Sequence, residues 1–405
     1  LIDTNFCGQD LRFTTLINAN LSGSKLMDTN LSDQQTLSGT QFVHSNLTRA
    51  NVSGTNISGA SFNNSLLHSI DFYKASNLPK ATYATSSLID SDFSGSFIEY
   101  VNFTNVTNMS GSRFIGVSGS NMIVKDANIS GSDFSLSTLN HVDFSGTKLI
   151  GKVDFTQTSL IDTDFCGQDL RFTTLINANI SDSKLMDTNL SHQILTGTQF
   201  VNSDLTRTNI DNTDVSGVNF SGAKLHHIDF TYDIHNIIDA IYHSSSLDNS
   251  EFNCTDISYI DFTNVTSMSG TKIRNLDANY IIVKDANLSG SDFTLSRVNH
   301  VDFSGSKPIG IVDFEWTELQ YTNFYNQDLR FTNLNNANFN NSFSQRIDLS
   351  GQNKLNNTKF TNSDLTFARV CNADIGTVDF RYSTLHMIDF YKALNIPGAN
   401  YQYST

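Results

Sequence analysis

Residues 155–179 read FTQTS-LIDTD-FCGQD-LRFTT-LINAN, and the first residue of every block is apolar. The same spacing continues from Phe155 to Phe230, where all 16 residues at intervals of five are apolar. With an apolar background of 38%, chance would give such a run roughly once in five million trials. The period of five is therefore a real property of the chain, and we call the apolar residue of each block its centre.

This period fits neither an α-helix, which repeats about every 3.6 residues, nor a strand, which repeats every 2. We therefore predict a chain that turns by about a right angle at every block, so that four blocks make a coil of about 20 residues. The centre and the residue two before it would point inward, and the other three residues outward. Centres 20 residues apart, such as Phe165, Leu185 and Leu205, would then stack.

The residues before each centre support this interpretation. The residue two before the centre is small or β-branched in 14 of the 16 blocks, which leaves room for a Leu or Phe at the centre. The residue directly before the centre is Asp or Asn in 10 of the 16 blocks. We interpret it as the turn residue of the repeat, because its side chain can bond nearby backbone groups.

The blocks Ala19-Asn20-Leu21-Ser22-Gly23 and Ala127-Asn128-Ile129-Ser130-Gly131 resemble the motif A-[D/N]-L-x-x of the pentapeptide-repeat family. The resemblance covers essentially the whole chain. It implies an all-β fold, a right-handed quadrilateral β-helix of about 20 coils. With coils ~4.8 Å apart, this solenoid would be a rod about 95 Å long.

A longer repeat is superimposed on the short one. Residues 1–31 and 160–190 differ only at Asn5/Asp164, Leu21/Ile180 and Gly23/Asp182, and a more diverged copy begins at Leu319. We predict a single continuous β-solenoid over residues 1–405 with modules 1–159, 160–318 and an incomplete 319–405. A 159-residue module is not a whole number of four-sided coils, so equivalent residues such as Phe6 and Phe165 should lie on adjacent faces.

The five-residue spacing slips at recurring places. The largest slips run from Phe72 to Tyr83, Phe230 to Tyr242 and Phe390 to Tyr401. Single extra residues fall in Leu31–Leu37, Phe103–Met109, Leu149–Phe155, Phe262–Met268 and Pro308–Phe314. We expect these insertions to bulge outward at corners, either as tolerated insertions or as the place for a loop-borne binding site.

No catalytic, cofactor-binding or metal-binding residue is predicted, and we expect no enzyme activity. The pairs His141/Asp143 and His300/Asp302 follow the repeat pattern, and a filled tube offers no cleft in which to shift a carboxyl pKa. His68, His226 and His386 each follow a centre and should point outward. The cysteines lack metal-ligand spacing and are expected to be free thiols; they are Cys7, Cys166, Cys254 and Cys371.

The sequence leaves the compartment open. It begins at Leu1 inside a repeat, and both ends lie within repeats, so we expect missing sequence, a dimer or end-to-end association. It contains no run of 18 apolar residues that would span a membrane. The Asn-x-Ser/Thr sites, such as Asn20, Asn30 and Asn46, arise from the repeat itself, and their glycosylation depends on the compartment.

The formal charge of −15 disfavours direct nucleic-acid binding. We expect a non-catalytic scaffold or protein-interaction rod. One alternative follows from the family resemblance: some pentapeptide-repeat proteins mimic DNA and occupy the DNA site of a type II topoisomerase. Duplex DNA of ~95 Å would carry roughly 56 charges, far more than this chain. A second alternative is a secreted or surface-exposed structural, effector or ice-facing protein built from Ser, Thr and Asn ladders.

Overall fold

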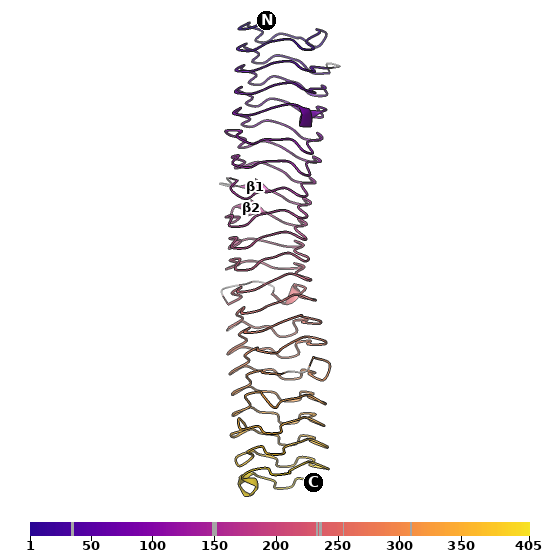
Figure 1. Cartoon of the computed structure of the whole chain (residues 1–405), viewed down its shortest axis with the longest axis vertical. Helices are drawn as coiled ribbons and strands as arrows, with labels where there is room; N and C mark the ends of the chain where they lie inside the picture. The colour runs from indigo at the N-terminus through magenta and orange to yellow at the C-terminus, as the bar shows by residue number, and fades with distance from the viewer. Residues whose placement is uncertain (34–35, 148–151, 232–233, 235–236, 254, 308–309) are drawn as a thin grey trace. The chain divides into compact units, whose positions relative to one another are not determined.

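The computed structural model describes residues 1–405 except 34–35, 148–151, 232–233, 235–236, 254 and 308–309. The chain divides into two compact units, Leu1–Asp204 and Leu205–Thr405, and each is considered by itself. In each unit the backbone winds in stacked coils (Figure 1). The elements of the described residues are the 3-10 helices η1 (Leu78–Lys80), η2 (Ile237–Asp239) and η3 (Ile396–Gly398), and the strands β1 (Val153–Asp154) and β2 (Thr173–Thr174).

Parallel backbone pairing joins each coil to the next. β1 pairs with β2, with Val153 opposite Thr173. Elsewhere single parallel bridges link residues 20 to 22 positions apart, such as Asn20 with Gln41 and Asn219 with Ile241. One bridge residue recurs about every five positions, so four ladders of bridges surround each coil. The predicted β-helix with pentapeptide sides is confirmed, whereas its handedness and number of coils remain predictions.

The core consists of the residues predicted to point inward. Every centre from Phe155 to Leu205 is buried, with at most 1% of its surface exposed. Stacked rings fill the interior of the first unit: Phe93 lies 4.9 Å from Phe114, which lies 4.6 Å from Phe134. Their spacing follows that of the coils, because equivalent centres lie one above another.

The corners are β-turns that begin at each centre. The amide of Ser24 donates to the carbonyl oxygen of Leu21, and Gly23 between them has a φ of 71°. A positive φ at the third turn residue explains the frequent Gly, Asn and Asp there.

The assignment of the preceding Asp or Asn as the turn residue is wrong. Asp164 lies in the bridge ladder between Asp143 and Lys184, directly before the corner. Its Oδ1 accepts a hydrogen bond from the amide of Cys166, the first residue after the centre. The carboxylate or amide therefore caps the turn from a strand position, which explains why a short polar acceptor is needed there.

The small inward residues also form hydrogen bonds, which their small size alone does not predict. Many are Ser or Thr whose hydroxyl donates to the carbonyl oxygen of a centre in the preceding coil. Thr40 Oγ1 lies 2.7 Å from Leu16 O, and Thr198 Oγ1 lies 2.8 Å from Leu175 O. These hydroxyls are buried but paired, so the interior tolerates them without the cost of an unsatisfied polar group.

Equivalent residues of successive modules lie on adjacent faces, as predicted. In the first unit Asn5 pairs with Lys25, so Phe6 belongs to the ladder of Leu26. Phe165 belongs instead to the ladder of Leu21. Bridges lead from Asp164 through Asp143 and Ile123 to Asn102. From there the stacked rings of Phe103, Tyr83, Phe62 and Phe42 continue to the coil of Leu21, whose amide donates to the carbonyl oxygen of Gln41. Leu21 and Leu26 occupy neighbouring sides of one coil.

The second unit repeats this relationship. Phe230 lies on a ladder whose bridges run from Asp229 to Asn333, and its equivalent Phe390 lies on the ladder that contains Asp328. Because Asp328 and Asn333 are five residues apart, these two ladders are neighbours. Repetition of the module therefore does not repeat one surface on one face.

The large slip from Phe72 to Tyr83 is tighter than expected. In Phe72–Tyr83 the centre position is taken by Leu78, which is fully buried at the start of η1. The extra residue is Asn77, whose φ of 59° is left-handed. The segment is thus two ordinary sides plus one residue rather than a long loop. The slips at Leu149, Phe230 and Pro308 include residues outside the described part of the chain, as does part of the slip after Leu31.

The Thr198 hydrogen bond can be tested by an isosteric change. Thr198→Val removes the donor to Leu175 O but keeps the shape, and we expect it to lower the unfolding free energy by about 1 kcal/mol. Thr198→Ser keeps the hydroxyl and should cost less. Urea denaturation measures both; equal or greater loss in the Ser variant would show that packing, not the hydrogen bond, is responsible.

Substitution of two corner glycines by alanine distinguishes the cost of backbone strain from the cost of a steric clash. Gly167 and Gly197 have φ of 68° and 70°, but a Cβ would meet nothing at Gly167 and would lie 2.2 Å from Asn177 Oδ1 at Gly197. We expect Gly167→Ala to cost about 1 kcal/mol and Gly197→Ala to cost more. Thermal unfolding of the two variants gives the comparison, and equal melting temperatures would contradict the proposed conflict.

Candidate functional site

The strongest candidate site begins at an irregular corner of the second unit. At the regular corners of the neighbouring coils, the amides of Ser296 and Thr317 donate to the carbonyl oxygens of Phe293 and Phe314. The amide of Leu276 instead donates to Ser296 Oγ. Leu276 is large at the usually small inward position, Ala278 is small at the centre, and both are buried.

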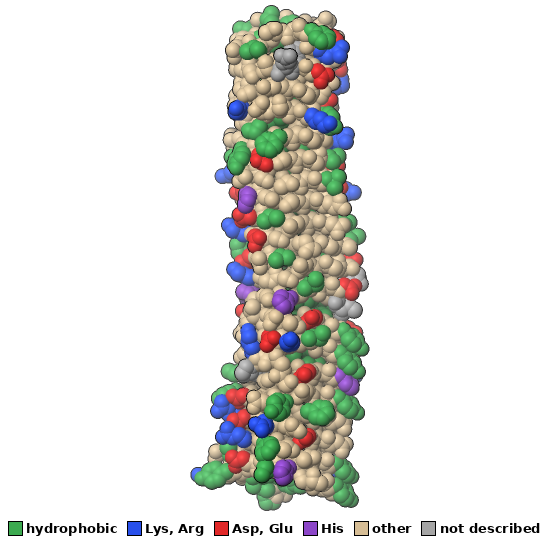
Figure 2. All heavy atoms as spheres, turned by 90° about the vertical axis from the view of Figure 1, so that its right-hand side faces the viewer, with side chains coloured by type: hydrophobic (Ala, Val, Ile, Leu, Met, Phe, Trp, Pro, Cys, Tyr) green, Lys and Arg blue, Asp and Glu red, His purple; other side chains and the backbone are tan. Residues whose placement is uncertain are grey.

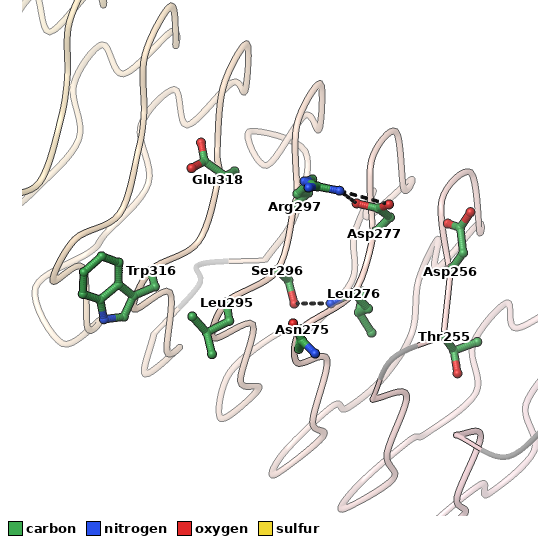
Figure 3. A pocket seen from close by; sticks show the side chains of 10 residues that line it. All are labelled: Thr255, Asp256, Asn275, Leu276, Asp277, Leu295, Ser296, Arg297, Trp316 and Glu318. Carbon is green, nitrogen blue, oxygen red and sulfur yellow. Dashed lines mark hydrogen bonds and ion pairs between the residues drawn. The ribbon is translucent and has the colours of Figure 1, made fainter.

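A groove of about 460 Å³ lies over this corner. Leu276 and Ser296 lie along its middle, and Leu295 and Trp316 lie together on one side (Figure 3). On the other side is a row of charged side chains from four successive coils (Figure 3). We call Asp256, Asp277, Arg297 and Glu318 the charged row.

Two large apolar side chains of the groove are exposed. Trp316, the only tryptophan of the chain, is 56% exposed, and Leu295 is 58% exposed. They occupy the same left-handed corner position on successive coils, with φ of 56° and 62°. On the next two coils this position is held by Asn336 and Asn357. The corner therefore accepts a polar residue, and folding does not require Leu295 or Trp316 there.

The charged row is only partly neutralised. Arg297 Nη1 lies 3.1 Å from Asp277 Oδ1. Asp256 accepts the amide of Ser258, and Glu318 accepts the side-chain amides of Gln320 and Asn338. Among the described residues neither Asp256 nor Glu318 has a cationic partner within salt-bridge distance. The row thus has a neutral pair in the middle and one negative charge at each end.

A stack of exposed rings borders the same face of the coil at its other corner. We call Tyr259, Tyr280, His300 and Tyr321 the tyrosine stack. Its ring centroids are 5.1, 4.6 and 4.9 Å apart, and the planes are parallel within 4°. Figure 2 shows exposed hydrophobic side chains and histidine following one another along the second unit. A hollow of about 480 Å³ lies beside Tyr280 and His300.

Other exposed aromatic rings occur in three identical segments, Gln-Asp-Leu-Arg-Phe-Thr, at residues 9–14, 168–173 and 327–332. In each segment the guanidinium bonds the carboxylate, as in Arg171 Nη2 to Asp169 Oδ2 at 2.7 Å, and lies over the Phe ring, here Phe172 at 5.5 Å. The hydrogen bond from Arg171 lowers the pKa of Asp169. The cation is already matched within the cluster, which makes it a weaker candidate than the groove.

Among the described histidines, His141 bonds a carboxylate other than that of Asp143. His141 Nδ1 lies 2.9 Å from Asp162 Oδ2 of the next coil, whereas Asp143 accepts the amide of Ser145. His300 belongs to the tyrosine stack. His68 and His226 bond Ser hydroxyls of the next coil, at 2.9 and 2.8 Å. Those two side chains are half-buried, and His386 is exposed as expected.

The described cysteines Cys7, Cys166 and Cys371 are free thiols, and Cys254 lies outside the described residues. Burial raises the pKa of Cys166 to about 11, so this thiol is a poor nucleophile at neutral pH. Within the described ranges, no cluster of His, Cys, Asp and Glu could hold a metal ion. Nor does the described part contain a helix of the length and apolarity needed to cross a membrane.

The period alone did not reveal the groove or the tyrosine stack. A signal for the stack was present, because Tyr259, Tyr280, His300 and Tyr321 recur two residues after a centre at intervals of 20 or 21. The groove had a subtler signal in Leu276 and Ala278, where the usual sizes of the two inward residues are exchanged.

Comparison with known proteins gives the family. The model described as pentapeptide repeats matches with eight copies, at residues 1–33, 34–68, 124–151, 152–185, 183–222 and 312–343. No curated protein matches the chain.

Several solved structures are similar to the chain. HetL of the cyanobacterium Nostoc sp. strain PCC 7120, involved in the regulation of heterocyst differentiation, is 19% identical over 62% of this chain and 87% of its own, with a TM-score of 0.20. A pentapeptide-repeat protein of the Arabidopsis thaliana thylakoid lumen is 24% identical over 26% of this chain and 68% of its own, with a TM-score of 0.18. QnrB1, a plasmid-mediated fluoroquinolone resistance protein, is 14% identical over 61% and 92%, with a TM-score of 0.19.

The TM-scores and sequence identities of these structures are too low to support an inference about what this chain binds. The family assignment comes from the repeat motif, the family model, and bridges 20 to 22 residues apart. The chain belongs to the pentapeptide-repeat family.

Proposed function

We propose that the chain is a non-catalytic scaffold that binds a partner protein through the groove at residues 255–318. The observation that carries the proposal is the exposed pair Leu295 and Trp316 beside a row of charges. Binding energy at protein interfaces is concentrated in a few residues, and Trp, Tyr and Arg are enriched among them. The groove combines Trp316 with Arg297, and the tyrosine stack extends the same face.

The residues of the groove favour binding over catalysis. The ten lining residues include neither histidine nor cysteine. Its carboxylates lie in an open groove, where water would screen them, and two of them, Asp277 and Glu318, occupy regular bridge positions. General acid–base catalysis benefits from groups held in a drier site.

The distribution of charge favours a protein partner over DNA mimicry. Several carboxylates pair with cations of adjacent coils, such as Asp28 with Arg49 and Asp277 with Arg297. A DNA mimic would need long rows of uncompensated negative charge to reproduce the phosphates. The alternatives of DNA mimicry and of a secreted or surface structural protein therefore rank below the proposed scaffold.

We further propose that the two units form one continuous right-handed solenoid of about 20 coils, built from modules 1–159, 160–318 and 319–405. With ~4.8 Å per coil, small-angle X-ray scattering should give a maximum dimension near 95 Å and the profile of a straight rod. A profile that requires two bodies joined at an angle would contradict continuity.

The binding role is tested by Leu295→Asn combined with Trp316→Asn. Asparagine suits the left-handed corner and matches Asn336 and Asn357 of the following coils, so the variant should fold. A partner isolated with the wild-type chain and then purified should bind the double variant at least about tenfold more weakly by calorimetry.

Phe367→Asn is the matched control, because Phe367 is an exposed ring at a left-handed corner outside the groove. It should bind the partner like the wild-type chain. Equal affinity of the wild-type chain and the groove variant for every purified partner would reject the groove as the binding site.

A further inference from the structure

The ends of the charged row are the first clue to the partner's chemistry. Asp256 and Glu318 carry the uncompensated charges, and Asp277 and Arg297 between them are paired with each other. A complementary partner would place a cation opposite each end and no charge opposite the middle. The matching is specific, because a like charge at either end would be repelled.

The coil spacing fixes the distance between these two ends. Asp256, Asp277, Arg297 and Glu318 belong to four successive coils, because Ile257 N donates to Asp277 O and bridges join Asp277 to Arg297 and Arg297 to Glu318. Three intervals of ~4.8 Å separate the end positions by about 14 Å.

An extended chain matches this distance in a whole number of residues. At ~3.4 Å per residue, residues four apart lie about 13.6 Å apart and point to the same side. The side chain midway between them also points to that side. It would lie over the neutral pair and beside Leu295 and Trp316, where an apolar side chain is favoured.

A helix fits less well. Spanning about 14 Å takes roughly nine helical residues, and residues nine apart point to opposite sides of a helix with 3.6 residues per turn. A strand can lay one row of side chains into such a groove while its backbone remains near the surface.

We propose that the groove binds an extended basic segment of a partner protein, in which two Lys or Arg residues four positions apart flank a central apolar residue. The basic residue at one end pairs with Glu318 and lies near the Trp316 ring; the other pairs with Asp256. This inference rests on the proposed function, because it names the partner for the same groove.

Trp316 provides the readout, since it is the only tryptophan of the chain and lies in the groove. The matched peptide is Gly-Ser-Arg-Ser-Leu-Ser-Arg-Ser-Gly, capped at both ends. The mismatched peptide Gly-Ser-Arg-Ser-Leu-Arg-Ser-Ser-Gly has the same composition, but its arginines are three apart and point to opposite sides. Each is titrated against the full chain while the Trp316 emission is recorded.

We expect the matched peptide to shift the Trp316 emission and to bind at least about fivefold more tightly than the mismatched peptide at low salt. Added salt should reduce this difference, because the charges are exposed. Asp256→Asn with Glu318→Gln should abolish the preference. The amide oxygen of Asn can still cap the Ser258 amide, so folding should be retained.

Asp364→Asn is the control, since Asp364 caps a corner in the same way on another ladder. It should leave the preference unchanged. Equal affinity for the two peptides, or a preference that survives the double variant, would overturn the inference. If a purified partner nevertheless depends on Leu295 and Trp316, the binding function stands and only the partner's chemistry is wrong.

Discussion

Backbone pairing between coils is the constraint on which the rest of the structure depends. Each bridge joins residues 20 to 22 positions apart and holds neighbouring coils at the spacing of a parallel sheet. A side chain at a given block position therefore has its counterpart on the next coil at nearly the same distance. The stacked Phe rings inside and the tyrosine stack outside follow from this one spacing, with ring centroids of 4.6–5.1 Å in the latter.

Because the coils are so regular, a groove marks a local departure from the repeat. At most corners the amide of the inward residue donates to the carbonyl oxygen of its own centre. At Leu276 the inward residue is large, its amide bonds Ser296 Oγ, and the surface beside it is hollow. Leu295 and Trp316 then lie exposed at the border of this hollow. The candidate site thus lies beside a local exchange of residue sizes rather than on a long inserted loop.

The sequence predicted the coil well because a period of five leaves few backbone solutions. It identified the inward positions and the placement of Phe6 and Phe165 on adjacent faces. It did not place Asp164 correctly, because an acceptor that caps a turn and a residue within the turn have the same sequence signature. It overestimated the slip at Phe72–Tyr83, since burial of Leu78 cannot be read from spacing alone. To predict the groove one must know which residues contact each other across coils. The spacing gives these contacts only after the ladders have been assigned.

The most direct measurement concerns the distance between successive coils at the tyrosine stack. Pyrene labels can be attached through Tyr280→Cys and His300→Cys in a chain whose native cysteines are replaced by serine. We expect strong excimer emission from this pair, because the two positions lie one coil apart, and little for labels at Tyr259→Cys and Tyr321→Cys, about 14 Å apart over three coils. Equal excimer emission from the two pairs, or none from the first, would contradict the stacking of equivalent positions on which the groove, the charged row and the proposed partner all rest.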